Sequence, residues 1–185
     1  MALFRGFIAV DVDVSSNILD FIEEISKSGA NVKLVEPENI HITLKFLGDT
    51  KEDLIDDITN ITRDSVAGVK PFKIRLVGTG VFPNENYIRV VWIGIKDSEI
   101  IAEIANRIDD RLSSLGFKKE RRGFSAHLTI GRVRTAENKE NLLNIINKYS
   151  DLEFCSLDVS SINLVKSDLT PKGPIYTTLK EVKLV

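Results

Sequence analysis

The sequence predicts an α+β fold with two similar lobes of mainly antiparallel sheet, helices on the outside and a cleft between the lobes. Strand-like segments alternate with amphipathic helical segments along the chain. The order strand, helix, strand and helix occupies roughly residues 3–65 and recurs at roughly residues 90–149. The only two histidines, His41 and His127, take equivalent places in the two copies. Such a repeat implies lobes related by a pseudo-twofold axis, with equivalent strands facing one another.

Strands are expected where β-branched and aromatic residues gather or alternate with polar ones. These segments are residues 3–12, 32–35, 40–47, 72–81, 87–95, 127–133, 152–165 and 176–184. A hairpin turn is expected at residues 82–86, and a long turn-rich connection at residues 166–174. Many short strands with few helices favour antiparallel pairing. No Gly-rich stretch follows a strand, which argues against a Rossmann or P-loop nucleotide fold.

Helices are expected where apolar residues recur at three- and four-residue spacing after a residue that can cap a helix. Their expected starts are Ser15 or Ser16, a capping-box-like pair at Thr50 and Asp53, the segment after residues 97–98, and Thr135 or Asn138. Gly29 and Gly116 are placed to end the first and third helices. The residues expected to face inward are Ile18, Phe21, Ile22, Ile25, Leu54, Ile55, Ile58, Ile61, Ile100, Ile101, Ile104, Ile108, Leu112, Leu142, Leu143, Ile145, Ile146 and Tyr149.

Length and composition favour one soluble domain that spans residues 1–185 and holds both lobes. The chain is 43% hydrophobic and 28% charged, as is ordinary for a globular protein. Its net charge of −2 gives no overall attraction to nucleic acid, so phosphate recognition would depend on local Lys and Arg residues. No apolar run is long enough for a membrane span and no signal peptide is evident, so a cytoplasmic location is expected. Cys155, the single cysteine, is expected to be a buried spectator thiol.

Each histidine lies in a His-x-Thr frame, HITL at residues 41–44 and HLTI at residues 127–130. Because side chains alternate along a strand, the histidine and threonine share one face while the apolar pair anchors the strand in the core. Two such strands across a cleft would offer two imidazoles and two hydroxyl groups to one phosphate. An imidazole titrates near neutrality, so a pair can move two protons in an in-line displacement at phosphorus.

Two other interpretations of the histidines must be considered. A lone histidine in a strand is more often a surface or satisfied core residue than a catalyst. Two matching frames at equivalent places in a repeat favour a shared site instead. A metal site is disfavoured, because two histidines without an obvious carboxylate or thiolate partner make a poor zinc ligand set.

Several longer motifs carry a resemblance to a known family. They are RGFIA (residues 5–9), EPENIHITLKFLG (36–48), FSAHLTIGR (124–132) and LTPKGPIY (169–176). With these motifs the chain resembles the RNA 2′,3′-cyclic phosphodiesterase group of the two-histidine (HXTX) phosphoesterase superfamily, historically called 2′-5′ RNA ligases. Ala126 stands where the family usually has Pro, Gly131 where Ala is common, and Leu34 where an aromatic residue is frequent.

The resemblance implies an enzyme, a phosphoric diester hydrolase that converts RNA 2′,3′-cyclic phosphate ends to 2′-phosphates. By the family pattern, His41 would donate a proton to the departing 3′ oxygen and His127 would accept one from water. Thr43 and Thr129 would bind the non-bridging oxygens, and no metal or other cofactor is implied. The expected partner is an RNA terminus with a 2′,3′-cyclic phosphate, tRNA fragments being one candidate; the chain is expected to act as a monomer.

Basic and aromatic residues near the motifs are further candidates for substrate binding. Arg132 is a candidate contact, although its odd separation from His127 would place it on the opposite face of a regular strand. A basic loop before the second frame could bind the RNA backbone or be solvated; its residues are Lys118, Lys119, Arg121 and Arg122. Stacking of a terminal base or packing in the core is expected of Phe46, Phe82, Phe124 and Tyr176.

Three alternatives to RNA-end hydrolysis remain open from the sequence. The same site could run in reverse and join a cyclic phosphate to a 5′-hydroxyl as a 2′-5′ ligase. It could act on a small cyclic-phosphate nucleotide. It could also be an RNA-end-binding module without turnover, in which case His41→Ala would change nothing at the RNA terminus.

Overall fold

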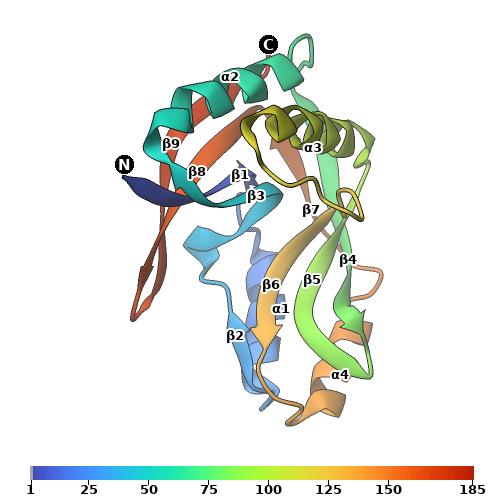
Figure 1. The fold of residues 1–185 in the computed structure, drawn as a ribbon. Helices are drawn as coiled ribbons and strands as arrows, with labels where there is room; N and C mark the ends of the chain where they lie inside the picture. Colours follow the sequence, from blue (N-terminus) through green and yellow to red (C-terminus); the bar gives the residue numbers. More distant parts are fainter. Residues whose placement is uncertain (1) are drawn as a thin grey trace.

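Two antiparallel sheets form the framework of the protein, in a computed structural model that describes residues 2–185 (Figure 1). The first sheet has the order β3-β1-β8-β9 and the second β2-β6-β5-β4-β7. The strands are β1 (Leu3–Asp11), β2 (Val32–Leu34), β3 (His41–Lys51), β4 (Phe72–Asn84), β5 (Tyr87–Lys96), β6 (His127–Val133), β7 (Glu153–Val159), β8 (Ser161–Thr170) and β9 (Gly173–Lys183). Every strand pair in the described part of the chain is antiparallel, which confirms the expected α+β class.

The two sheets correspond position by position. The first histidine strand, β3, pairs with β1, and the second, β6, pairs with β5. Next come β8 in the first sheet and β4 in the second, and then β9 and β7. The short strand β2 extends the second sheet beyond β6. The expected pair of similar lobes, each with its own histidine strand, is therefore confirmed.

The helices interlock the two halves of the chain. They are α1 (Ser16–Lys27), α2 (Ile55–Ser65), α3 (Glu99–Leu112) and α4 (Lys139–Lys148). Figure 1 shows α2 and α3 together at one end of the molecule, where they contact β9 and β3; α1 and α4 lie at the other end against β2, β7 and β4. A helix from each half thus covers the sheet that holds the other half's histidine. None of these helices combines the length and the apolar character that a membrane crossing needs.

Strand alternation in β1 explains how the first lobe serves both the core and the cleft. Ile8 and Val10 belong to a continuous buried core that also includes residues of the second sheet. Phe7 and Ala9 point to the opposite face, where they form a small second cluster with Val165 and the half-buried Tyr176. Because β1 pairs with β3, this second cluster lies beside His41 and supports its ring.

Residues 152–165, expected as one strand, form two strands in different sheets. Strand β7 ends at Val159 beside β4, and β8 begins at Ser161 beside β1. The chain crosses between the sheets at Ser160, whose carbonyl oxygen accepts a hydrogen bond from the Leu184 amide (2.9 Å). The expectation was wrong because both strands are rich in buried apolar residues, so the sequence reads as one uninterrupted run.

The turn-rich stretch at residues 166–174 is mostly strand. Strands β8 and β9 pair as far as Thr170 and Gly173, so only Pro171 and Lys172 form the turn. The Thr170 hydroxyl donates to the Gly173 carbonyl (2.6 Å) and accepts from the Lys172 amide (3.2 Å), which closes this tip. The hairpin turn expected at residues 82–86 is likewise shorter, since β4 continues to Asn84. Both turns are therefore shorter than the stretches of turn-forming residues in the sequence indicated.

Two expectations about helices were also wrong. Thr50 does not cap α2; it is buried within β3 and its hydroxyl donates to the Gly48 carbonyl (3.0 Å). Asp53 lies in the short 3₁₀ helix Glu52–Leu54, and α2 begins at Ile55 without a side-chain cap. Pairing of β3 with β1 as far as Lys51 overrides the local capping signal at Thr50.

The second wrong expectation concerns Ile100, which is exposed in the first turn of α3. The buried face of that helix is formed by other residues.

Candidate active site

One cleft between the lobes brings both His-x-Thr frames together. It has a volume of about 370 Å³, and its lining includes His41 and Thr43 from β3 and His127 and Thr129 from β6. In each frame the intervening residue is fully buried in the core, as strand alternation requires. The four polar side chains that sequence analysis selected thus face a single space. The roles assigned to them remain predictions.

The His41 ring is fixed by contacts on several sides. Its Nδ1 is 2.7 Å from the Asn39 carbonyl oxygen, and its Nε2 is 2.9 Å from the Thr43 hydroxyl. Phe7 stacks on the imidazole with ring centroids 4.6 Å apart, and Tyr176 approaches edge-on at 5.3 Å. Since a carbonyl oxygen only accepts, Nδ1 must carry the hydrogen, and the neutral ring has its lone pair on Nε2.

Burial lowers the pKa of His41 below its ordinary value of 6.5. The aromatic neighbours remove water from the ring, which disfavours the charged imidazolium. The Asn39 carbonyl and the negative charge of Asp11 act in the opposite direction and raise the pKa, but they are weaker. His41 is therefore a relatively strong acid once it is protonated, and an anion in the cleft would offset its cost of charging.

His127 repeats the same anchoring with a more open ring. Its Nδ1 is 2.7 Å from the Ser125 carbonyl oxygen, two residues earlier in the chain, as Asn39 is from His41. Phe82 meets the ring edge-on, with centroids 5.0 Å apart. Nδ1 again carries the hydrogen, so in both neutral imidazoles Nε2 holds the lone pair. The two halves of the chain thus present imidazoles prepared in the same way for proton transfer.

A β-bulge in each histidine strand brings a further residue to the cleft. In β6 the pairing with β5 moves from Thr129 to Gly131 and skips Ile130, so Ile130 and Gly131 are both buried and Arg132 returns to the exposed face. This extra residue reverses the alternation and explains why Arg132 lines the cleft despite its odd separation from His127. The alternation in a regular strand could not predict this.

The equivalent bulge in β3 brings Phe46 to the same cleft as Arg132. Pairing with β1 skips Leu44, so Leu44 and Lys45 are buried in succession and Phe46 is 62% exposed. Phe46 stands five residues after its histidine, as Arg132 does, and both line the cleft. The cleft therefore carries a cation on one lobe and an aromatic ring on the other, a pair that suits a nucleotide's phosphate and base.

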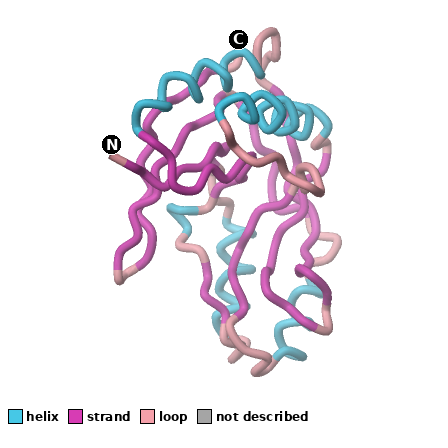
Figure 2. The backbone as a smooth tube through the Cα atoms, viewed as in Figure 1, coloured by secondary structure: helices cyan, strands magenta, loops and turns pink. Residues whose placement is uncertain are grey.

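Lys45 connects the first histidine strand to the loop before the second. Its side chain is 2% exposed, and its Nζ lies 2.5 Å from Asp109 of α3. The same ammonium group donates to the Lys118 carbonyl (2.6 Å) and lies 3.5 Å from a Glu120 carboxylate oxygen. Asp109 in turn accepts from the Glu120 amide (3.0 Å). This network holds the loop at residues 116–126, the long irregular segment between α3 and β6 in Figure 2.

The basic loop residues expected to bind RNA are not among those that line the cleft. Lys119 pairs with Asp110 of α3 (2.7 Å), and the Lys118 side chain borders a neighbouring cavity. Arg121 and Arg122 are exposed beside the cleft's Gly123. The structure thus brings Arg132 to the histidines but leaves the loop cations outside, where contact with RNA stays a prediction.

The aromatic candidates all reach the cleft, but with different partners. Phe46, Phe82, Phe124 and Tyr176 are among its lining residues. Tyr176 and Phe82 pack edge-on against the two imidazoles, so they position catalytic candidates and leave Phe46 the most open ring. Sequence analysis missed the role of Phe7, which it placed only in the strand expected at residues 3–12 and in the motif at residues 5–9. It also missed the backbone carbonyls that bind Nδ1 of each histidine, although Asn39 and Ser125 both stand two residues before their histidine.

Within residues 2–185, no three His, Cys, Asp or Glu side chains are grouped to hold a metal ion. Cys155 in β7 is half-buried, and burial raises the pKa of its thiol, so the thiolate nucleophile is disfavoured. The donors that the cleft offers are imidazoles, hydroxyl groups and a guanidinium, which suit an anionic ester.

Comparisons with known proteins agree with this arrangement. A sequence profile described as the 2′-5′ RNA ligase superfamily matches residues 14–171. The chain is 45% identical over 179 residues to the RNA 2′,3′-cyclic phosphodiesterase of Methanocaldococcus jannaschii, covering 96% of this chain and 99% of that one. It superimposes on the crystal structure of TT0787 of Thermus thermophilus with a TM-score of 0.78 and 27% identity, over 97% of each chain. E. coli LigT in complex with 3′-AMP shares the fold, with a TM-score of 0.75 at 21% identity over 100% of this chain and 99% of that one.

Proposed function

The chain belongs to the 2′-5′ RNA ligase superfamily, and from this we propose that it hydrolyses RNA 2′,3′-cyclic phosphate ends to 2′-phosphates. Relatives that match nearly the whole chain are named RNA 2′,3′-cyclic phosphodiesterases. The observation that carries the proposal is the single cleft lined by both His-x-Thr frames. Two imidazoles can supply the general base and the general acid of a metal-independent displacement at phosphorus, and two hydroxyl groups can bind the phosphate oxygens.

In the proposed reaction His127 is the general base. Its neutral Nε2 would accept a proton from water as the water oxygen attacks phosphorus. The Ser125 carbonyl holds the other ring nitrogen, Nδ1, in its protonated form, so the ring is oriented before substrate arrives. The more open surroundings of this ring are suitable for a residue that must meet a water molecule.

His41 is the proposed general acid. As the bond between phosphorus and the 3′ oxygen breaks, protonated Nε2 would give its proton to that oxygen, and the phosphate would remain on the 2′ oxygen. Burial lowers the pKa of His41, which makes the imidazolium a stronger donor, while the negative phosphate would favour its protonation on binding. The assignment of acid and base follows the family pattern, and this asymmetry of burial supports it.

The threonines are proposed to bind the non-bridging oxygens. Thr43 Oγ1 lies 2.9 Å from His41 Nε2, so the hydroxyl can reach the same phosphate as the imidazole. Thr129 occupies the equivalent place beside His127 in the cleft. Arg132 would add a cation close to the phosphate, and Phe46 an exposed ring for the terminal base. The proposed partner is an RNA 3′ end, and we propose that a single copy of the chain binds it in the cytoplasm.

End-group analysis of an RNA substrate tests this proposal. An oligonucleotide with a 2′,3′-cyclic phosphate is expected to gain only a 2′-phosphate, at the same rate with or without EDTA. The kcat/KM should follow a bell-shaped pH profile, because one imidazole must be protonated and the other neutral. A 3′-phosphate product, dependence on a metal, or an unchanged RNA end would contradict the proposal. Addition of a 5′-hydroxyl RNA tests the reverse reaction, for which joined product would be the sign.

A further inference from the structure

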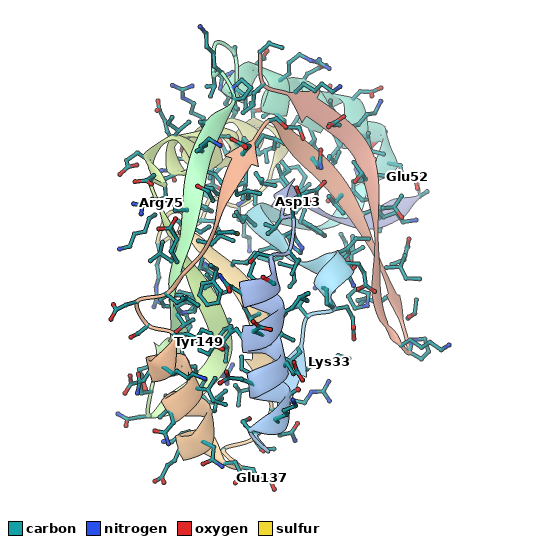
Figure 3. All side chains as sticks on the ribbon, turned by 180° about the vertical axis from the view of Figure 1, so that it is seen from behind. Asp13, Lys33, Glu52, Arg75, Glu137 and Tyr149 are labelled. Atoms are coloured by element: carbon teal, nitrogen blue, oxygen red, sulfur yellow. The ribbon has the colours of Figure 1, made fainter. Side chains whose placement is uncertain are left out.

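A second cavity continues from the cleft along the outer end of the second lobe. We call it the basic groove and define it by Tyr87, Arg89, Arg132, Arg134 and Lys139; its volume is about 500 Å³. It lies between the β4–β5 turn, the end of β6 and the start of α4. Figure 3 labels Glu137 at this tip of the molecule, in the loop that leads into α4. We propose that the basic groove binds the RNA strand upstream of the terminal phosphate.

The cleft and the basic groove are continuous through one residue. Arg132 lines both of them, because the bulge in β6 turns its side chain outward after the second frame. A 2′,3′-cyclic phosphate closes the 3′ end of an RNA, so every other nucleotide lies on its 5′ side. If the cleft holds that end, as proposed above, the rest of the strand must run out of the cleft, and two neighbouring cavities share lining residues with it.

Charge distinguishes these two cavities beside the cleft. The basic groove carries four cations and a single carboxylate, that of Glu137. The other neighbouring cavity, of about 630 Å³, shares Lys45, Phe46 and Glu120 with the cleft. It is lined by three carboxylates, those of Asp49, Asp53 and the shared Glu120. Its cations are Lys51, Lys118 and Lys45, and Lys45 is already paired with Asp109. A polyanion would therefore be attracted to the basic groove and not to the other cavity.

The cations of the basic groove are available to a ligand. Elsewhere on the surface many basic side chains are paired with a carboxylate, such as Lys73 with Asp158 and Lys148 with Glu24. In the described part of the chain, no carboxylate lies within 4.0 Å of the charged nitrogens of Arg89, Arg132, Arg134 or Lys139. A phosphodiester would supply the missing counter-charge.

An aromatic ring accompanies these cations. Tyr87 is 57% exposed, and the Arg89 guanidinium packs over its ring, 5.0 Å from the centroid. The Tyr87 hydroxyl also accepts hydrogen bonds from Arg89 Nε (3.1 Å) and Nη2 (2.8 Å), which holds the pair together. Cations that follow a backbone, together with an exposed ring on which a base can stack, are the usual equipment for binding single-stranded RNA without sequence preference.

The test compares a long and a short ligand in variants of the basic groove. The long ligand is a fluorescent RNA of roughly eight nucleotides ending in a 2′-phosphate, which covers a typical single-strand site. The short one is adenosine 2′,3′-cyclic phosphate, whose hydrolysis needs only the cleft. The variants are Arg134→Ala and Lys139→Ala, and the matched control is Lys51→Ala, an exposed lysine in the other cavity.

Each groove variant is expected to weaken RNA binding by about three- to tenfold and to reduce the salt slope of log Kd by about 0.7. The kcat/KM for the mononucleotide should stay unchanged, which also shows that the variants fold. Lys51→Ala should bind RNA as the wild type does. Unchanged RNA affinity in both groove variants, or a loss in Lys51→Ala alone, would overturn the proposed path. Failure of the wild type to hydrolyse either substrate would instead refute the proposed function. The binding measurement does not depend on hydrolysis, so the two proposals can fail separately.

Discussion

Removal of the Lys45 ammonium group should destabilise the protein, because this group ties the first histidine strand to α3 and to the loop before the second. In Lys45→Met the side chain keeps a similar length but loses its charge. Asp109, only 14% exposed, would be left without its cation. Loss of one partner of a buried ion pair typically costs about 3–5 kcal/mol. Because Asp109 would still accept from the Glu120 amide, we expect the lower value, about 3 kcal/mol.

Urea unfolding at neutral pH measures this effect, and thermal unfolding provides a second readout. For a chain of this length, 3 kcal/mol corresponds to a Tm lowered by about 6–12 °C. The matched control is Lys73→Met, which removes an ion pair to Asp158 of similar length (2.7 Å) whose partners are 69% and 72% exposed. That substitution should cost at most about 1 kcal/mol, because exposed pairs contribute little.

The double variant Lys45→Met/Asp109→Leu separates charge from packing. It removes the uncompensated carboxylate, so most of the lost stability should return. If Lys45→Met costs no more than Lys73→Met, or if the second substitution deepens the loss, the assigned role of the buried pair is wrong.

Three further predictions concern the site itself. The pKa of His41, followed by NMR, should lie below 6.5 in the free protein because of burial, and it should rise when a 2′-phosphate nucleotide binds. The free energy of unfolding should fall as the pH drops through 6.5, because the unfolded chain binds the proton more readily than the folded one. An unshifted His41 titration would contradict this. Thr43→Val and Thr129→Val should each lower kcat/KM by about 10- to 100-fold, because each would remove a hydrogen bond to a charged phosphate oxygen, and full activity in either variant would contradict the proposed phosphate contacts. Gly131→Ala should destabilise the fold by about 1–3 kcal/mol in urea unfolding, because its Cβ would lie 2.7 Å from Val32 Cγ1; equal stability would mean that β2 moves freely.

The sequence predicted the parts of the fold that depend on periodicity. The two histidine strands, the helices and the repeat follow from alternation and from helical spacing, and the structure contains all of them. It could not separate β7 from β8, because crossing between sheets at Ser160 leaves no break in the apolar pattern. It also placed a helix start at Thr50, where pairing with a strand from the N-terminus extends β3 instead. Long-range pairing was decisive in both cases.

In the candidate site, too, the residues that follow from local periodicity could be predicted, and those that depend on long-range pairing could not. His41, Thr43, His127 and Thr129 could be selected because alternation along a strand relates them directly to one face. Arg132 could not be placed, since a bulge depends on the register with the neighbouring strand. The Lys45 network joins residues that are far apart in the chain, and no local pattern relates Lys45 to Asp109.

The most direct test of the paired site is the kcat/KM of His41→Ala, His127→Ala and the double variant on a 2′,3′-cyclic phosphate RNA. Each single variant should lose about 10²- to 10⁴-fold, because each imidazole transfers one proton. If both act on the same phosphorus in one displacement, the double variant should be little worse than the poorer single variant. Full activity in either single variant, or losses that multiply in the double variant, would contradict the account.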